Sequence, residues 1–256
     1  MKATIKKHLP KIITYAYRLI RNPKDLMALA GFIGRPKSSV TLTTRLKIGY
    51  RLLQISDCIH CPHTQAEIIS FIKAILALSP EIKGDILEAG CYKGGSTAKF
   101  SIVAKIAGRK LLVFDSFEGI PSNNEHHGKD IFGNPAGFSK GDYAGDLEEV
   151  KNNIKKYGEI ETCEFIKGWF SETMPNLKRP LALVYLDVDL ASSTKTCLQY
   201  LYPLISLRGS LFSQDGHLPL VIDIFDDEEF WHGQVGMEKP VIEGLRKRKL
   251  IKITKD

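Results

Sequence analysis

The glycine-rich stretch at residues 85–97 has the residue types and spacing to hold a nucleotide-like cofactor. A short apolar run ends at Glu88, and Gly90, Gly94, Gly95 and the Ser96-Thr97 pair then lead into a helix-like pattern that starts at Ala98. Glycine accepts positive φ and has no Cβ, so such a turn brings backbone N–H groups and the positive end of a helix close to a ligand. The spacing is not G-x-G-x-x-G and no Gly-Lys-Ser/Thr follows, so the cofactor need not carry a pyrophosphate. A tight packing corner without a ligand is the alternative.

Carboxylates at the ends of predicted strands give a second chemical signal. They are Glu88, Asp115, Asp187, Asp189 and Asp215. Parallel strands end at one edge of a sheet, so we expect these side chains to line that edge. Because like charges repel and buried charges are costly, they require cationic or hydroxyl-bearing partners. Asp115, ~20 residues or more beyond the glycine-rich turn, is placed to accept hydrogen bonds from the ribose hydroxyls of an adenosine-type cofactor.

Alternating strand and helix patterns must position these residues. Strands are predicted at 85–88, 110–115, 162–166, 181–186 and 210–213, and helices at 64–78, 98–106, 147–157 and 192–204. The alternation predicts an α/β fold with a mainly parallel, doubly wound sheet. The segment 120–145, rich in Gly, Asn, Pro and His, is predicted to be a long binding loop. Beyond residue 216, Leu218–Phe225 is of ambiguous type, a helix is expected near 240–248, and 250–254 is strand-like.

The N-terminal part of the chain differs in charge from the rest. Residues 1–57 contain 12 Lys/Arg and 2 Asp/Glu, within a net charge of +7 for 256 residues. We therefore divide the chain into a basic, mostly helical arm at 1–60 and a main domain at 61–256, since 256 residues allow one large domain and an appendage. One or two helices are expected within 1–30, with Pro23 as a break or a new start, and a loop from Gly31. The arm is expected to serve oligomerisation or to act as a lid, with membrane-surface contact and a merely solvated helix face left open. The sequence contains no run of about 18 apolar residues, which is the length needed to span a membrane.

Cysteine usage indicates a reduced, cytoplasmic setting. The five cysteines are odd in number and scattered, and no secretory signal is evident. Cys58, His60, Cys61 and His63 have the spacing of half a zinc site, but no second pair of ligands follows. A reduced loop before a helix is favoured, with Thr64 and Glu67 forming a capping box at the start of that helix.

Four stretches together resemble the macrocin O-methyltransferase family of class I S-adenosylmethionine-dependent enzymes. They are Glu88-Ala-Gly90-Cys-Tyr-Lys-Gly94-Gly95-Ser96, Phe114-Asp115-Ser116-Phe117-Glu118-Gly119-Ile120-Pro121, Lys167-Gly168-Trp169-Phe170 and Tyr185-Leu186-Asp187-Val188-Asp189. The resemblance covers roughly residues 64–216 and implies a Rossmann-like sheet, with residues 61–256 as the methyltransferase domain. It also implies S-adenosylmethionine as methyl donor and a divalent metal, usually Mg²⁺, that holds two oxygens of the acceptor.

The resemblance further implies roles for individual residues. The methionine and ribose side of the cofactor would lie on Glu88, Gly90, Tyr92, Gly94, Gly95 and Ser96. Asp115 and Ser116 would hold the ribose, and Gly168 and Trp169 would lie near the adenine. For Trp169, a place in the apolar core is an alternative of equal weight to a place beside the cofactor.

The resemblance also implies that the metal would lie on Asp187, Gln214 and Asp215. Coordination to Mg²⁺ lowers the pKa of an alcohol hydroxyl and fixes its direction, and carboxylate oxygens suit that ion. The family commonly ends the fifth strand in two aspartates, whereas here Gln214 precedes Asp215. One negative charge is therefore missing, and a weaker metal affinity is expected. Asp187, Asp189 and His217 are the candidate general bases.

The sequence thus predicts a cytoplasmic O-methyltransferase that acts on a hydroxyl of a sugar, in a natural product or a polysaccharide. A homo-oligomer is expected, and nucleic acid is not expected as a partner, because the Asn/Asp-Pro-Pro-Tyr/Phe motif of amino-group methylation is absent after the fourth strand. The alternative is a non-catalytic binding module or scaffold with the same fold, suggested by Gln214 and the basic arm.

Overall fold

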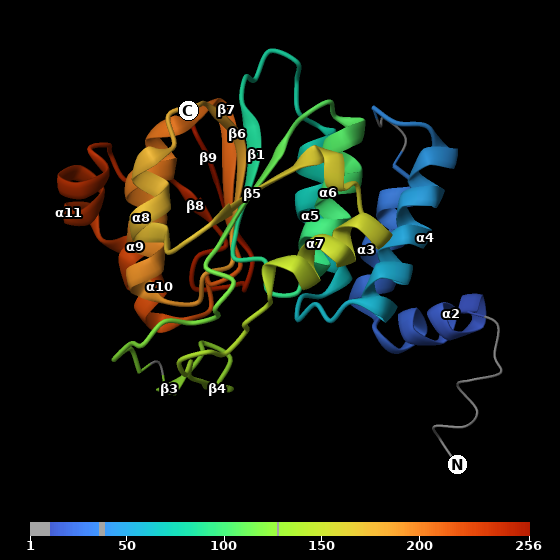
Figure 1. Ribbon diagram of the computed structural model, residues 1–256, viewed down its shortest axis with the longest axis horizontal. Helices are drawn as coiled ribbons and strands as arrows, with labels where there is room; N and C mark the ends of the chain where they lie inside the picture. Colours follow the sequence, from blue (N-terminus) through green and yellow to red (C-terminus); the bar gives the residue numbers. More distant parts are fainter. Residues whose placement is uncertain (1–10, 36–38, 127) are drawn as a thin grey trace.

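A central sheet of seven strands organises the computed structural model, which describes residues 11–35, 39–126 and 128–256 (Figure 1). In their order across the sheet, the strands are β5 (Cys163–Lys167), β2 (Leu111–Asp115), β1 (Asp85–Ala89), β6 (Leu181–Leu186), β7 (Ile205–Ser213), β9 (Ile251–Thr254) and β8 (Ile242–Glu243). The first five are parallel, and β9 pairs antiparallel with both β7 and β8. The predicted mainly parallel α/β sheet is confirmed.

Helices cover both faces of this sheet (Figure 1). On one side lie α2 (Lys11–Arg21), α3 (Pro23–Ile33), α4 (Leu42–Cys58), α5 (Gln65–Leu76), α6 (Gly95–Ile106) and α7 (Leu147–Tyr157). On the other lie α8 (Phe170–Thr173), α9 (Ala191–Leu201), α10 (Pro219–Asp226) and α11 (Glu228–Phe230). Short 3-10 turns occur at Ile160–Thr162, Met174–Asn176 and Tyr202–Leu204, and a π-helical turn at Trp231–Val235.

Alternation along the strands divides the apolar core into two layers. Ile86 of β1 and Tyr185 of β6 pack in the layer of α5 and α6, whereas Leu87 and Val184 pack in the layer of α9 and α10. Every residue of β6 is buried. A strand covered by helices on both faces must be apolar on both, and this explains why its sequence is a continuous apolar run.

The described residues of the predicted arm are largely helical and contribute to the first core layer. Leu29, Phe32, Ile48 and Leu52 are buried there with Phe71 of α5. The predicted loop begins at Gly34 rather than Gly31, because α3 continues to Ile33. The remaining residues of the arm, 1–10 and 36–38, lie outside the described chain, and its boundary at residue 60 stays a prediction. In the described chain, no helix combines the length and the apolarity that crossing a membrane requires.

The predicted helix near 240–248 is wrong. This segment contains β8 and a turn in which Gly244 has φ +86° and Arg246 has φ +61°, values that no right-handed helix accommodates. The chain reverses there so that β9 can pair with β7. The ambiguous segment Leu218–Phe225 lies almost entirely in helix α10, and the strand-like pattern at 250–254 corresponds to β9. The long loop carries a short hairpin of β3 (Gly128–Lys129) and β4 (Pro135–Ala136).

Candidate active site

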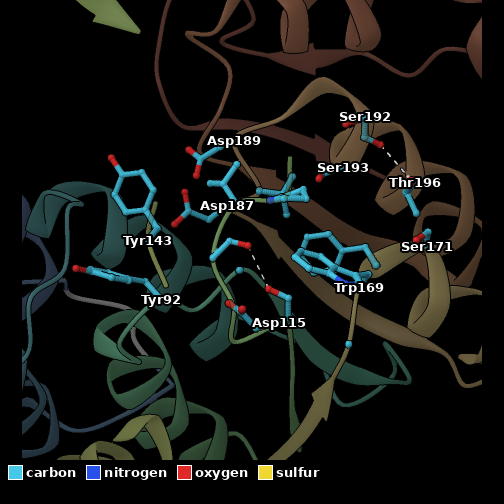
Figure 2. Close-up of a pocket in the computed structure, with 18 of the residues that line it drawn as sticks. Tyr92, Asp115, Tyr143, Trp169, Ser171, Asp187, Asp189, Ser192, Ser193 and Thr196 are labelled. Atoms are coloured by element: carbon cyan, nitrogen blue, oxygen red, sulfur yellow. Dashed lines mark hydrogen bonds between the residues drawn. The ribbon is translucent and has the colours of Figure 1, made fainter. Parts of the chain in front are cut away.

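A cavity of about 470 Å³ opens at the carboxyl ends of β1, β2, β5 and β6 (Figure 2). Segments that follow these strands supply most of its wall, and the start of α9, the loop before α5 and the turn before β9 supply the rest. The polar and aromatic lining residues include Tyr92, Asp115, Ser116, Tyr143, Trp169, Ser171, Asp187, Asp189, Ser192, Thr196, His63 and Lys249. Its volume lies within the range of small-molecule sites, roughly 300–1,000 Å³.

The glycine-rich turn contributes only its first part to this cavity. Gly90, with φ +84°, and Tyr92, with φ +49°, line it. A Cβ on Gly94 would lie 3.1 Å from Val150 Cγ1, and one on Gly95 would lie 2.8 Å from Cys61 Cβ. These two glycines therefore allow α6 to pack against its neighbours and lie outside the cavity lining.

Glu88 is completely buried at the end of β1 and does not line the cavity. Burial raises its pKa from an ordinary 4.5 to about 7, an effect that the hydroxyls of Ser96 and Thr97 reduce. Ser96 is likewise buried in the first turn of α6. Glu88 and Ser96 thus support the glycine-rich turn from the buried side, away from the cavity.

Glu88→Gln is expected to stabilise the protein at pH 8 by as much as about 3 kcal/mol and to have little effect near pH 4. The unfolded chain releases the Glu88 proton near pH 4.5 and the folded chain only near pH 7, so wild-type stability falls as the pH rises through this window. Urea denaturation of both proteins between pH 4 and pH 8 measures the difference. Glu229→Gln, on an exposed side chain, is the matched control. A stability difference that does not change with pH contradicts the prediction.

Asp115 is held rigidly at the end of β2. Its Oδ2 accepts a hydrogen bond from the Cys91 N–H and its Oδ1 one from the Phe117 N–H, each at 2.7 Å. Burial raises the pKa of this carboxyl, although the two N–H groups oppose the shift. The Ser116 hydroxyl accepts a hydrogen bond from the Glu118 N–H at 3.1 Å and so fixes the turn that follows. One carboxylate thereby ties the turns after β1 and β2 together.

Gly168 and Trp169 form the wall beyond Asp115. The Gly168 N–H donates to the Asp115 carbonyl at 3.0 Å, and φ +144° at Gly168 redirects the chain after β5. The half-buried Trp169 lines the cavity rather than the core, with Ser171 and Thr196 on the same side (Figure 2).

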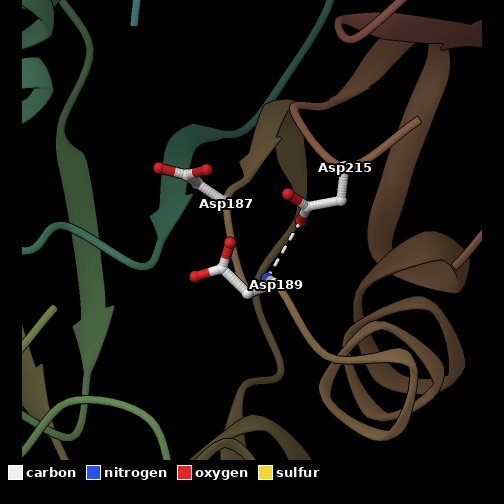
Figure 3. A group of neighbouring side chains, drawn as sticks. All are labelled: Asp187, Asp189 and Asp215. Atoms are coloured by element: carbon white, nitrogen blue, oxygen red, sulfur yellow. Dashed lines mark hydrogen bonds between the residues drawn. The ribbon is translucent and has the colours of Figure 1, made fainter. Parts of the chain in front are cut away.

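Three carboxylates converge at the ends of β6 and β7 (Figure 3). Asp187, Asp189 and Asp215 each place an oxygen within 4.8 Å of the other two. Asp215 Oδ2 accepts hydrogen bonds from the N–H groups of Val188, at 3.0 Å, and Asp189, at 3.2 Å. Burial, and then the Asp187 charge, raise the pKa of Asp215 to about 7. Burial and the other two carboxylates also raise the pKa of Asp189 well above its usual range. The cluster therefore favours a bound cation.

Two cationic residues that the sequence analysis did not place here face this cluster. His63 Nε2 lies 2.6 Å from Asp187 Oδ2, and only 2% of the His63 side chain is exposed. Burial disfavours both charged forms, but pairing outweighs it and leaves the pKa of His63 raised and that of Asp187 lowered. Lys249 lines the cavity, and its charge helps to lower the pKa of Asp187 and partly offsets the raised pKa values of Asp189 and Asp215. The sequence offered one signal for His63, its position in the loop just before the Thr64 capping box. It offered no signal for Lys249.

The predicted capping box is present: the Glu67 N–H donates to Thr64 Oγ1, and the Thr64 N–H donates to Glu67 Oε2 at 2.8 Å. The predicted half zinc site of Cys58, His60, Cys61 and His63 does not form part of a possible metal-binding cluster among the described residues. In the part of the chain that the structure describes, the aspartate cluster is the only group of three or more His, Cys, Asp or Glu residues with ligand atoms suitably close.

Gln214 and His217 lie outside the cavity lining. The Gln214 amide donates to the Tyr185 hydroxyl at 2.5 Å inside the core, and its carbonyl oxygen is buried without a hydrogen-bond partner among the described residues. The His217 ring stacks on Phe132 of the β3–β4 hairpin, with centroids 6.5 Å apart. Burial and the charge of Lys249 lower the pKa of His217. Of the predicted base candidates, only Asp187 and Asp189 face the cavity.

The end of the cavity opposite Trp169 is aromatic (Figure 2). Tyr143, from the long loop, meets Tyr92 edge to face at 5.6 Å between centroids. Tyr143 has φ +55°, held by backbone hydrogen bonds between its turn and Ile120. Another loop residue, Glu125, accepts hydrogen bonds from the first N–H groups of α9. The predicted binding loop is thus anchored at the cavity on both sides of the aspartates.

Comparison with known proteins shows which sequences the chain resembles. The model of the Macrocin-O-methyltransferase (TylF) family matches residues 68–229. The chain is 31% identical over 172 residues to the 8-demethyl-8-(2,3-dimethoxy-alpha-L-rhamnosyl)-tetracenomycin-C 4'-O-methyltransferase of Streptomyces olivaceus, covering 65% of this chain and 64% of that protein. It is 29% identical over 164 residues to the mycinamicin III 3''-O-methyltransferase of Micromonospora griseorubida, covering 61% and 65%. The chain thus spans less than two thirds of the length of these curated relatives.

Solved structures agree on the fold. The O-methyltransferase NovP superposes with a TM-score of 0.55 at 25% identity, over 80% of this chain and 79% of that one. The calicheamicin methyltransferase CalS11 superposes with a TM-score of 0.57 at 17% identity, over 91% of both chains. The sheet is therefore that of a class I methyltransferase, and because the family model matches more than half of the sequence, the chain belongs to the macrocin O-methyltransferase family.

Proposed function

We propose that the protein transfers a methyl group from S-adenosylmethionine to a hydroxyl of a sugar, in a natural product or a polysaccharide. The observation that carries this proposal is that two members of the aspartate cluster, Asp187 and Asp189, line the same cavity as Asp115 and Trp169, with Asp215 behind them. The residues that would bind the cofactor and those that would activate the acceptor hydroxyl thus lie in the same cavity. The curated relatives are named as methyltransferases of rhamnosyl tetracenomycin and of mycinamicin III, which supports a sugar-bearing acceptor.

The cavity fits S-adenosylmethionine by its donor and acceptor groups. Asp115 would accept hydrogen bonds from the ribose hydroxyls, with Ser116 beside it, and Gly168 and Trp169 would border the adenine. Gly90 and Tyr92 would border the methionine part, while Glu88, Gly94, Gly95 and Ser96 would hold the turn in shape. The cofactor supplies an electrophilic methyl group, and the protein supplies its orientation toward the acceptor oxygen.

The aspartate cluster fits Mg²⁺, which binds through a few carboxylates and retains water. Asp187 and Asp215 would hold the ion, and Asp189 would serve as a third ligand more readily than Gln214, whose amide lies on Tyr185. Such an ion would lower the pKa of an acceptor hydroxyl. The general base would then be Asp187 or Asp189, since His217 does not line the cavity. A cytoplasmic location and a homo-oligomeric state stay predictions.

Titration calorimetry with S-adenosylmethionine and S-adenosylhomocysteine, followed by assays on nucleotide sugars and glycosides, tests this proposal. Binding in the micromolar range is expected, with turnover that EDTA lowers at least about tenfold and Mg²⁺ restores. Failure of both ligands to bind at millimolar concentration contradicts it. Binding without methyl transfer to any sugar favours a scaffold with the methyltransferase fold.

A further inference from the structure

Helix α2 presents an apolar stripe that no described part of the chain covers. Ile13, Tyr17 and Ile20 are 46%, 56% and 69% exposed, and their spacing places them on one helical face. The opposite face is the one that packs, through Tyr15, which is 3% exposed and lies edge to face with Tyr50. Helix α2 thus packs against the protein through the face that carries Tyr15. The opposite, apolar face is exposed.

Basic charge lies at one end of this stripe. Arg21 and Lys24 are exposed at its end, and the Arg21 guanidinium lies 4.9 Å from the centre of the Tyr17 ring. The two acidic residues of the arm have partners within the chain: Asp25 accepts a hydrogen bond from the Ala66 N–H at 3.0 Å, and the exposed Asp57 lies beside Tyr15. The outward charge is therefore positive, in agreement with 12 Lys/Arg against 2 Asp/Glu in residues 1–57.

A second exposed apolar element lies toward the same side of the molecule. Helix α2 and the β3–β4 hairpin both project at the end where the parallel strands finish, at the bottom of Figure 1. Between the two hairpin strands, Phe132 is 55% and Ile131 37% exposed. The side that carries the cavity thus has apolar projections in two segments that are far apart in the sequence.

We propose that α2 docks on the surface of an anionic lipid bilayer, with Ile13, Tyr17 and Ile20 among the headgroups and Arg21 and Lys24 on lipid phosphates. An interfacial helix of this kind combines an apolar face with a basic rim, and both contribute to its affinity for anionic lipid. A symmetric contact with a second copy would instead bring two strongly basic arms together, which their repulsion opposes. Docking in this way brings the carboxyl edge of the sheet, and the cavity there, toward the membrane surface.

Co-sedimentation of the full chain with phospholipid vesicles tests this proposal. The protein is expected to bind vesicles that contain about 30% phosphatidylglycerol and not those of phosphatidylcholine alone, and to dissociate in about 0.5 M NaCl. Ile13→Ser/Ile20→Ser and Arg21→Glu/Lys24→Glu should each lower the partition coefficient at least about fivefold. Leu207→Ser and Val241→Ser, on side chains 67% and 84% exposed outside the arm, are the controls and should bind as wild type.

Two results would overturn the proposal. One is the absence of binding to anionic vesicles at low salt, with circular dichroism confirming a folded protein. The other is a dimer, detected by light scattering without lipid, that the α2 variants dissociate, since the stripe then faces a second copy. Because vesicle binding is measured without cofactor or acceptor, neither result depends on methyl transfer.

Discussion

Asp187→Asn is expected to lower kcat for methyl transfer by roughly 10²–10³-fold, a typical loss when a group that stabilises charge at the reacting centre is removed. The Asp187 carboxylate lies where the aspartate cluster, His63 and the cavity meet. Its amide replacement has the same shape, but it removes one negative charge from the aspartate cluster and takes away the anionic partner of His63. Steady-state kinetics with saturating S-adenosylmethionine and a sugar acceptor measures the effect.

The same variant should bind S-adenosylhomocysteine within about threefold of wild type, because the proposed arrangement places the lost charge on the acceptor side of the cavity. Asp223→Asn is the matched control, since Asp223 is exposed on α10 and does not line the cavity. A variant that retains more than about a third of the wild-type kcat would show that the aspartate cluster is not the reacting centre.

Asp115→Asn is expected to raise the Kd for S-adenosylmethionine by roughly 10–100-fold, which corresponds to the loss of a hydrogen bond to a charged group. Both oxygens of Asp115 accept from backbone N–H groups, those of Cys91 and Phe117. Asparagine has one oxygen, so its NH₂ group must face one of these donors. The substitution therefore loosens both turns and weakens the ribose contact at the same time.

Calorimetric titration of the cofactor measures this effect, and Asp146→Asn serves as the control. Asp146 caps α7 by accepting from the N–H groups of Glu148 and Glu149, a position where asparagine is equally favoured. Cofactor affinity unchanged in Asp115→Asn would mean that the ribose does not lie at the end of β2.

The cavity has two chemically different ends, which suggests how the protein would separate cofactor from acceptor. Trp169, Ser171 and Thr196 lie at one end and Tyr92 and Tyr143 at the other, with the aspartates between them (Figure 2). Sugars present apolar C–H faces as well as hydroxyls, so an aromatic pair beside carboxylates suits such an acceptor. The loop 120–145 supplies Tyr143, and variation in this loop is expected to change acceptor choice.

Much of the fold was predictable because its signals are local. A doubly covered strand such as β6 must be apolar at every position, and the helix α5 begins at a capping box that spans only Thr64 to Glu67. The turn before β9 was mispredicted as a helix because its composition is helix-like, whereas pairing between β9 and β7 decides its path. That pairing joins residues about forty positions apart, which no local pattern records.

The sequence by itself determined the family, the parallel sheet and the position of Asp115, Asp187, Asp189 and Asp215 at strand ends, because strand direction fixes which edge receives them. Only the tertiary structure decided which groups meet there. It brought His63 and Lys249 to the aspartates, turned Gln214 toward Tyr185, and left Glu88 buried behind the wall. These outcomes depend on side-chain direction and on contacts between segments more than 100 residues apart, such as the pair of His63 and Asp187. The packing of the whole chain determines these side-chain positions, and residue spacing in the sequence does not.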